Sequence, residues 1–72
     1  MRINYLYSHS DGRRARLVYI DNGRVNHARL IIRAEAGQGA VLLNKVYTTR
    51  RGARAALTRR GGAWTCIARH TY

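Results

Sequence analysis

The chain has 72 residues and a mass of 8.2 kDa, which is the size of one small domain. Its 14 Lys and Arg residues stand against 3 Asp and Glu residues, so the net charge of +11 favours a polyanionic partner. The single cysteine, Cys66, excludes an internal disulfide and a cysteine-based zinc site, and no apolar run is long enough to cross a membrane. The N-terminal sequence MRINYLY contains no signal-peptide core, so we expect a reduced cytoplasmic domain, residues 1–72, with no cofactor or metal ion.

The aliphatic content is low for a folded protein. Leu, Ile and Val total 15 residues and Phe is absent, close to the roughly 20% level below which highly charged chains stay disordered. We therefore expect a folded domain with a thin core.

The first half of the chain predicts three strands. Residues 2–7 alternate between polar and apolar side chains, and residues 15–21 are rich in Leu, Val, Tyr and Ile. Asn22-Gly23 is a strong hairpin signal, and the returning strand follows over residues 25–33.

The second half predicts a strand, a helix and a last strand. The Gly-Gln-Gly segment at 37–39 precedes a strand over 40–47, a helix over 50–60 and a strand over 63–72. The order β-β-β-β-α-β predicts an α+β fold, in which one helix packs on one face of an antiparallel sheet of about five strands.

The predicted helix has start and stop signals and a narrow apolar stripe. Thr48 or Thr49 is the expected N-cap, and Gly61-Gly62 ends the helix. The stripe has the helical spacing i, i+3, i+4 and consists of Ala53, Ala56 and Leu57.

A two-residue turn at Asn22-Gly23 would fix which side chains face each other. Arg16 would then lie opposite Arg29, with a phosphate between them or with both side chains splayed into water. One face of the hairpin would carry the apolar residues Ala15, Leu17, Tyr19, Ala28, Leu30 and Ile32, suited to covering by the helix. The other face would be basic, with Arg16, His27, Arg29 and Arg33 among aliphatic side chains.

The helix is basic too, and no acid lies at helical spacing from its arginines. Arg50, Arg51 and Arg54 lie near its N-terminus, where free N–H groups favour an anion, so we expect a phosphate or carboxylate site there. The alternative is a solvated surface without function. The candidate anion-binding residues are Arg16, Arg29, Arg33, Arg50, Arg51, Arg54 and Arg59.

Other side chains with chemical potential have structural interpretations. Trp64 and Tyr19 are expected in the core, although exposed tyrosines between arginines could stack on unpaired bases. Along the last strand we expect one side to carry Trp64, Cys66, Ala68 and His70, with Cys66 as a small core residue. The histidines are scattered, and we expect polar surface residues at His9, His27 and His70. The acids lie singly at turns, so we expect no enzyme.

Two segments resemble known small proteins. The sequence Val-Tyr-Ile-Asp-Asn-Gly-Arg-Val at 18–25, with the basic strand, Gly-marked loop and short helix that follow, resembles phage-encoded anti-CRISPR inhibitors. The segment from Gly-Ala-Val-Leu-Leu at 39–43 to Tyr-Thr-Thr-Arg-Arg-Gly-Ala at 47–53 is similar to the YegP-like family of small ββαβ domains. The acid of that family's strand is missing here, and Asn44-Lys45 replaces its Ser-Glu. Neither resemblance implies a particular site residue.

The sequence therefore predicts a non-enzymatic module that contacts DNA, RNA or a nucleoprotein complex through an arginine-rich surface. The anti-CRISPR resemblance implies an alternative, a phage or mobile-element inhibitor of a host nucleoprotein defence machine. Further alternatives are a small ribonuclease toxin and a structural RNA-binding protein. No membrane partner is expected.

Overall fold

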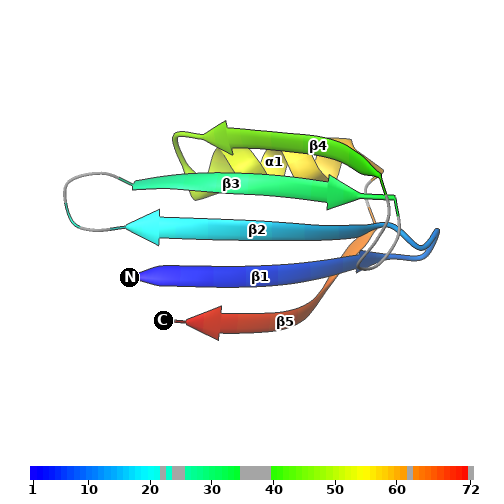
Figure 1. Ribbon diagram of the computed structural model, residues 1–72, viewed down its shortest axis with the longest axis horizontal. Helices are drawn as coiled ribbons and strands as arrows, with labels where there is room; N and C mark the ends of the chain where they lie inside the picture. Colours follow the sequence, from blue (N-terminus) through cyan, green and yellow to red (C-terminus); the bar gives the residue numbers. More distant parts are fainter. Residues whose placement is uncertain (22, 24–25, 35–39, 62, 72) are drawn as a thin grey trace.

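The computed structural model describes residues 1–21, 23, 26–34, 40–61 and 63–71. Its elements are β1 (Arg2–His9), β2 (Arg14–Asp21), β3 (Asn26–Arg33), β4 (Val41–Tyr47), α1 (Arg50–Arg59) and β5 (Trp64–Thr71). The strands form one antiparallel sheet in the order β4-β3-β2-β1-β5, with α1 on one face (Figure 1). The predicted α+β fold is confirmed, and each element begins and ends within two residues of its predicted bounds.

The helix covers only part of its face of the sheet. It connects β4 and β5, which lie at opposite edges of the sheet, and it packs against β3, β4 and β2. In Figure 1 it lies behind β3 and β4. We call the face that carries α1 the helix face and the opposite face the open face. On the helix face, β1 contributes Tyr7 to the core that the helix covers, whereas β5 lies at the edge of the sheet beyond β1.

The core is small and lies between the two central strands and the helix. Leu17, Leu30 and Ile32 are its fully buried large side chains. They meet the predicted helical stripe, in which Ala53 is 0% exposed and Leu57 is 4% exposed. The two buried alanines of that stripe keep the helix close to the sheet. The predicted assignment of the hairpin residues to an apolar and a basic face is confirmed.

The predicted register of the β2–β3 hairpin is wrong by two residues. The first pair is Asp21 with Asn26, rather than the pairs of a two-residue turn. Asp21 accounts for the longer connection, because its Oδ1 accepts the N–H of Gly23 at 2.9 Å and its Oδ2 accepts the Tyr19 hydroxyl at 3.3 Å. Such bonds from Asp to nearby backbone groups compete with strand pairing. Residues 22, 24 and 25 lie outside the described residues.

The new register changes which arginines face each other. Arg16 lies opposite Ile31, so the predicted opposition of Arg16 and Arg29 is wrong. The directly opposed pair is instead Arg14 and Arg33. A shift of two residues leaves every side chain on its predicted face, because side chains alternate with a period of two.

A bulge in β5 overturns the predicted side-chain arrangement there. Cys66 pairs with Tyr7 on the helix face, whereas Ala68 pairs with Leu6 on the open face, and the register shifts between these pairs. The prediction that Trp64, Cys66, Ala68 and His70 share one side is therefore wrong. Cys66 is exposed, contrary to the core prediction, because β5 is an edge strand beside the helix. Trp64 is partly buried against the core, as predicted.

A polar cluster at the β1–β2 turn anchors the end of the helix. The Arg13 guanidinium donates to the Asp11 carboxylate at 2.7 Å and to the Arg60 carbonyl at 2.7 Å. The Asp11 N–H donates to His9 Nδ1 at 3.2 Å, so His9 Nε2 is the nitrogen that donates to the Gly61 carbonyl at 3.3 Å. The His9 side chain is only 11% exposed, so the prediction that it is a polar surface residue is wrong.

Candidate nucleic-acid interface

The structure divides the predicted anion-binding residues between two surfaces on opposite sides of the sheet. The sheet residues Arg16, Arg29 and Arg33 lie on the open face. The helix residues are Arg50, Arg51, Arg54 and Arg59, and all seven arginines are exposed. A single continuous site made of all seven is therefore excluded by the fold.

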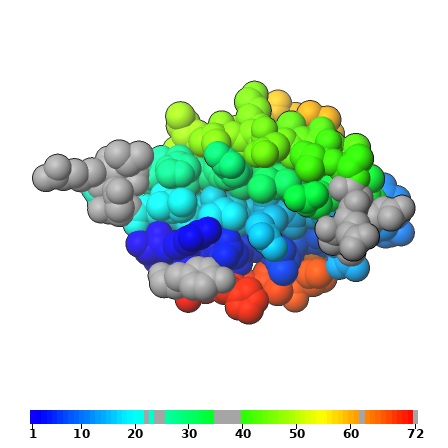
Figure 2. Space-filling view, viewed as in Figure 1, coloured from blue at the N-terminus to red at the C-terminus, as the bar shows by residue number. Residues whose placement is uncertain are grey.

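The open face carries four exposed arginines on the two neighbouring strands β2 and β3, which we call the open-face arginines: Arg14, Arg16, Arg29 and Arg33. The sequence prediction missed Arg14, although its position two residues before Arg16 places it on the same face of the strand. Among the described residues this face has no carboxylate, since Asp11 lies in a turn and Asp21 lies on the helix face. Figure 2, which looks onto this face, shows that strands rather than the helix form it.

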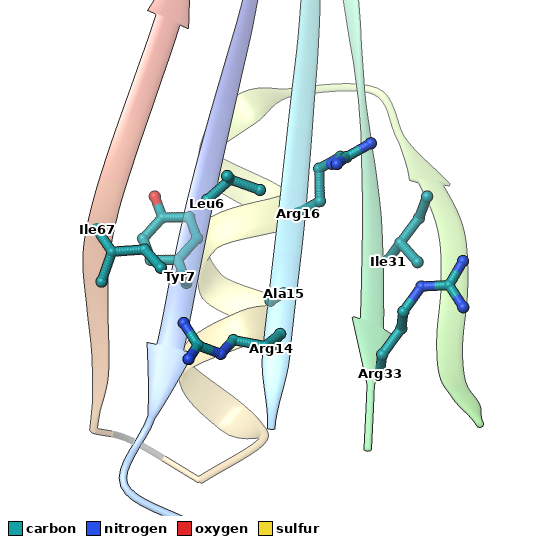
Figure 3. Close-up of a pocket in the computed structure, with 8 residues that line it drawn as sticks. All are labelled: Leu6, Tyr7, Arg14, Ala15, Arg16, Ile31, Arg33 and Ile67. Carbon is teal, nitrogen blue, oxygen red and sulfur yellow. The ribbon is translucent and has the colours of Figure 1, made fainter. Parts of the chain in front are cut away.

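Part of the open face is hollowed. Arg14, Arg16 and Arg33 line a hollow of ≈ 370 Å³, together with the apolar residues Leu6, Ile31 and Ile67. Figure 3 shows that the guanidinium of Arg14 extends over β1 and that of Arg33 extends over β4, so the opposed pair diverges. The arginines therefore border an apolar floor, and their charged ends point outward.

A second hollow lies on the helix face. This helix-side hollow measures ≈ 520 Å³ and is lined by Tyr19, Arg50, Arg51, Arg54, Ala55 and Thr58. The Arg50 guanidinium lies 5.2 Å from the centroid of the Tyr19 ring, and its Nη1 donates to the Tyr5 hydroxyl at 3.0 Å. Arg50 is thereby fixed in direction, and the structure brings it together with Arg51 and Arg54 as predicted.

Arg59 does not join this group. It lies in the last turn of α1, and its Nε donates to the Ala55 carbonyl at 3.4 Å. Because successive residues turn by about 100° around a helix, Arg59 points away from the flank that carries Arg50 and Arg54.

The helix N-terminus is already capped by the chain itself. Thr49 Oγ1 accepts the N–H of Gly52 at 3.0 Å, and the Thr49 carbonyl accepts the N–H of Ala53 at 3.2 Å. Thr49 is thus the N-cap, as the sequence predicts. The three nearby arginines border the side of the helix rather than its end, so the flank is the candidate anion site.

The described residues show no cluster of metal-ligating side chains. They contain no group of three or more His, Cys, Asp or Glu side chains that could hold a metal ion. Cys66 and His70 lie on opposite faces of β5, because the bulge separates them. Burial raises the pKa of the Tyr7 hydroxyl above its usual value of 10.0, so this group is protonated at neutral pH.

Comparison of the chain with protein-family models, curated proteins and solved structures finds no match. Within the described ranges, no helix has the length and apolar character needed to cross a membrane. The resemblances to anti-CRISPR inhibitors and to YegP-like domains stay predictions.

Proposed function

We propose that this protein is a non-enzymatic nucleic-acid-binding module and that the open-face arginines contact the phosphates. The supporting observation is that Arg14, Arg16, Arg29 and Arg33 are exposed on two adjacent strands of a face without a carboxylate among its described residues. Unpaired guanidinium groups on a flat surface suit phosphate oxygens, which they bind with two parallel hydrogen bonds.

The dimensions of the cluster set the expected number of contacts. Neighbouring strands are about 4.8 Å apart and each residue advances about 3.3 Å. Arg29 and Arg33 are therefore about 13 Å apart along β3, with Arg14 and Arg16 beside them on β2. Four phosphate contacts on duplex DNA would give a slope of about −3.6 for log K against log[salt].

A salt titration with matched variants tests the proposal. We expect Arg16→Gln/Arg29→Gln to make the slope less negative by about 2, because two phosphate contacts are lost. Arg59→Gln/Arg60→Gln removes the same charge from the end of the helix, far from the open face, and we expect a smaller change in slope. A wild-type slope near zero, or equal changes in both double variants, would contradict the proposal.

One observation favours a second candidate, the inhibitor of a nucleoprotein complex. The open face also exposes aliphatic side chains that phosphates cannot use, with Val46 48% and Ile67 52% exposed. A protein surface beside nucleic acid would bury them and contribute free energy. Weak binding to free nucleic acid, combined with tight capture of a nucleoprotein complex that Val46→Ser weakens, would support this candidate over the first.

A further inference from the structure

The helix face carries tyrosines where the helix does not cover the sheet. Tyr5 and Tyr19 are partly buried residues at the border of the core, on β1 and β2. The rings of Tyr5 and Tyr7 are stacked, with centroids 6.4 Å apart and an angle of 28° between their planes. Tyr7 is buried in the core, whereas the partly buried Tyr5 and Tyr19 provide flat ring surfaces at its edge.

Arginine side chains lie over these rings. The guanidinium of Arg50 is 5.2 Å from the Tyr19 centroid, and that of Arg69 is 5.7 Å from the Tyr5 centroid. Tyrosine rings and guanidinium planes are the surfaces on which proteins stack unpaired bases. Of these residues, Tyr19 and Arg50 line the helix-side hollow, and Tyr5 is hydrogen-bonded to Arg50.

The same hollow has cations without acidic partners. Arg51 and Arg54 are exposed, and the ion pair of Arg13 with Asp11 lies at the opposite end of the helix. Among the described residues, Asp21 has its carboxylate beside Tyr19, and this carboxylate accepts the hydrogen bonds of the Tyr19 hydroxyl and the Gly23 N–H. Arg51 and Arg54 are thus available to a phosphate next to a stacked base.

The volume of the helix-side hollow and the net charge of the chain indicate which kind of ligand this hollow can bind. A volume of ≈ 520 Å³ lies within the roughly 300–1,000 Å³ of small-ligand sites. A base in a duplex has both faces covered by its neighbours, so a ring surface in a hollow can stack only on an unpaired base. A second copy of this chain is a poor occupant, because each copy carries a charge of +11.

We infer that the helix-side hollow binds an unpaired base of single-stranded nucleic acid, which stacks on the exposed Arg50 guanidinium that the Tyr19 ring holds in place, while Arg51 and Arg54 contact its phosphates. The inference rests on the proposed function and adds a preference for single strands over duplexes. DNA and RNA share this chemistry, so oligo(dT) and oligo(U) are both suitable probes.

The test measures the affinity of the full chain for oligo(dT), oligo(U), an abasic single strand of equal length and a duplex, by fluorescence anisotropy. The wild-type protein should bind both oligomers about 5- to 160-fold more tightly than the abasic strand, which corresponds to about 1–3 kcal/mol for stacking of one base. Tyr19→Leu should abolish this difference, whereas Tyr19→Phe, which keeps the ring, should retain it. Equal affinity of the wild-type protein for abasic and normal strands would overturn the inference.

Matched controls separate stacking from general effects. Tyr47→Leu removes a ring on β4, which is also partly buried against the core but lies outside the hollow, and it should leave the preference unchanged. If Tyr19→Leu fails to fold, Arg51→Gln/Arg54→Gln decides, since both side chains are exposed. That variant should lose about tenfold or more in affinity for single strands, against less than threefold for the charge-matched Arg59→Gln/Arg60→Gln. Equal losses would overturn the inference.

The result also distinguishes the inference from the proposed function. If the helix-side variants change nothing, and Arg16→Gln/Arg29→Gln still weakens binding to every probe, the inference is wrong and the proposed function stands. If the wild-type protein binds none of the probes, the proposed function itself is wrong.

Discussion

Reversing the charge of either arginine in the opposed open-face pair should stabilise the fold. Arg14 and Arg33 face each other across β2 and β3, and like charges in that position destabilise a strand pair. Arg14→Glu and Arg33→Glu each convert the repelling pair into an attracting one. The double variant restores a like-charge pair, so it should lose what each single variant gains.

The expected magnitude follows from the exposure of the pair. An exposed ion pair contributes about 0.2–1 kcal/mol, and the diverging guanidinium groups in Figure 3 place this pair near the lower limit. The coupling free energy in the double-mutant cycle is four times the energy of one pair. The wild-type protein and the double variant each contain a repelling pair, and each single variant contains an attracting pair. We therefore expect a coupling free energy of about 1 kcal/mol at low ionic strength. General effects of lowering the net charge of +11 cancel in the cycle.

Urea unfolding of the four proteins measures this coupling. It should shrink toward zero near 1 M salt, where the Debye length is about 3 Å. The matched control is the same cycle for Arg16 and Arg29, which are diagonal rather than direct neighbours in the observed register. Its coupling should be less than half as large, because the diagonal separation is about 7–8 Å. A larger coupling for Arg16 with Arg29 would refute the register and the reasoning built on it.

Three further predictions concern the remaining structure. The backbone N–H of Arg13, together with the Arg13 guanidinium, lowers the pKa of the Asp11 carboxyl below 3.8. The ionised Asp11 therefore stabilises the fold, and this stabilisation should be lost as pH falls through the lowered pKa. Asp11→Asn should flatten this part of an acid denaturation curve. Burial raises the pKa of Tyr7 above 10.0, so stability should fall as pH rises through the raised value, and Tyr7→Phe should remove that loss in alkaline unfolding followed by circular dichroism. Leu30→Ala, at a fully buried position, should lower the free energy of unfolding in urea by about 2–5 kcal/mol and leave little folded protein. Leu42→Ala, at a position 51% exposed, should lower it by less than about 0.5 kcal/mol.

The sequence predicts the faces of the sheet better than its register. Alternation of side chains assigns Leu17 and Leu30 to the face covered by the helix. This assignment holds for any change in the β2–β3 register by an even number of residues. The register itself depends on the hydrogen bonds of the Asp21 carboxylate. The sequence does not indicate these bonds, because the neighbouring Asn-Gly pair predicts a two-residue turn. The exposure of Cys66 could not be predicted either, because it depends on a bulge and on a helix that stops short of β5.

The candidate site shows the same division. The helical arginines Arg50, Arg51 and Arg54 could be predicted as a group from their spacing. Their position beside Tyr19 depends on where α1 crosses the sheet, which follows from the packing of two small alanines against β3 and β4. The periods of two and 3.6 residues in the sequence describe single strands and single helices. They therefore do not predict a contact between a strand residue and the flank of a helix.

The way in which this chain holds its charge on the helix face links the fold to the inferred single-strand site. In the described part, Arg13 forms an ion pair with Asp11, whereas several other cations lie over aromatic rings. These cations are Lys45 over Tyr47, Arg50 over Tyr19 and Arg69 over Tyr5. Arg13 lies over Trp64 and is also paired with Asp11. A ring orients a cation and contributes about 0.5–1 kcal/mol at an exposed site, but it does not neutralise the charge as a carboxylate does. Arginines held in this way keep their full attraction for a polyanion while their conformational freedom is already reduced, so less entropy is lost when they bind phosphate.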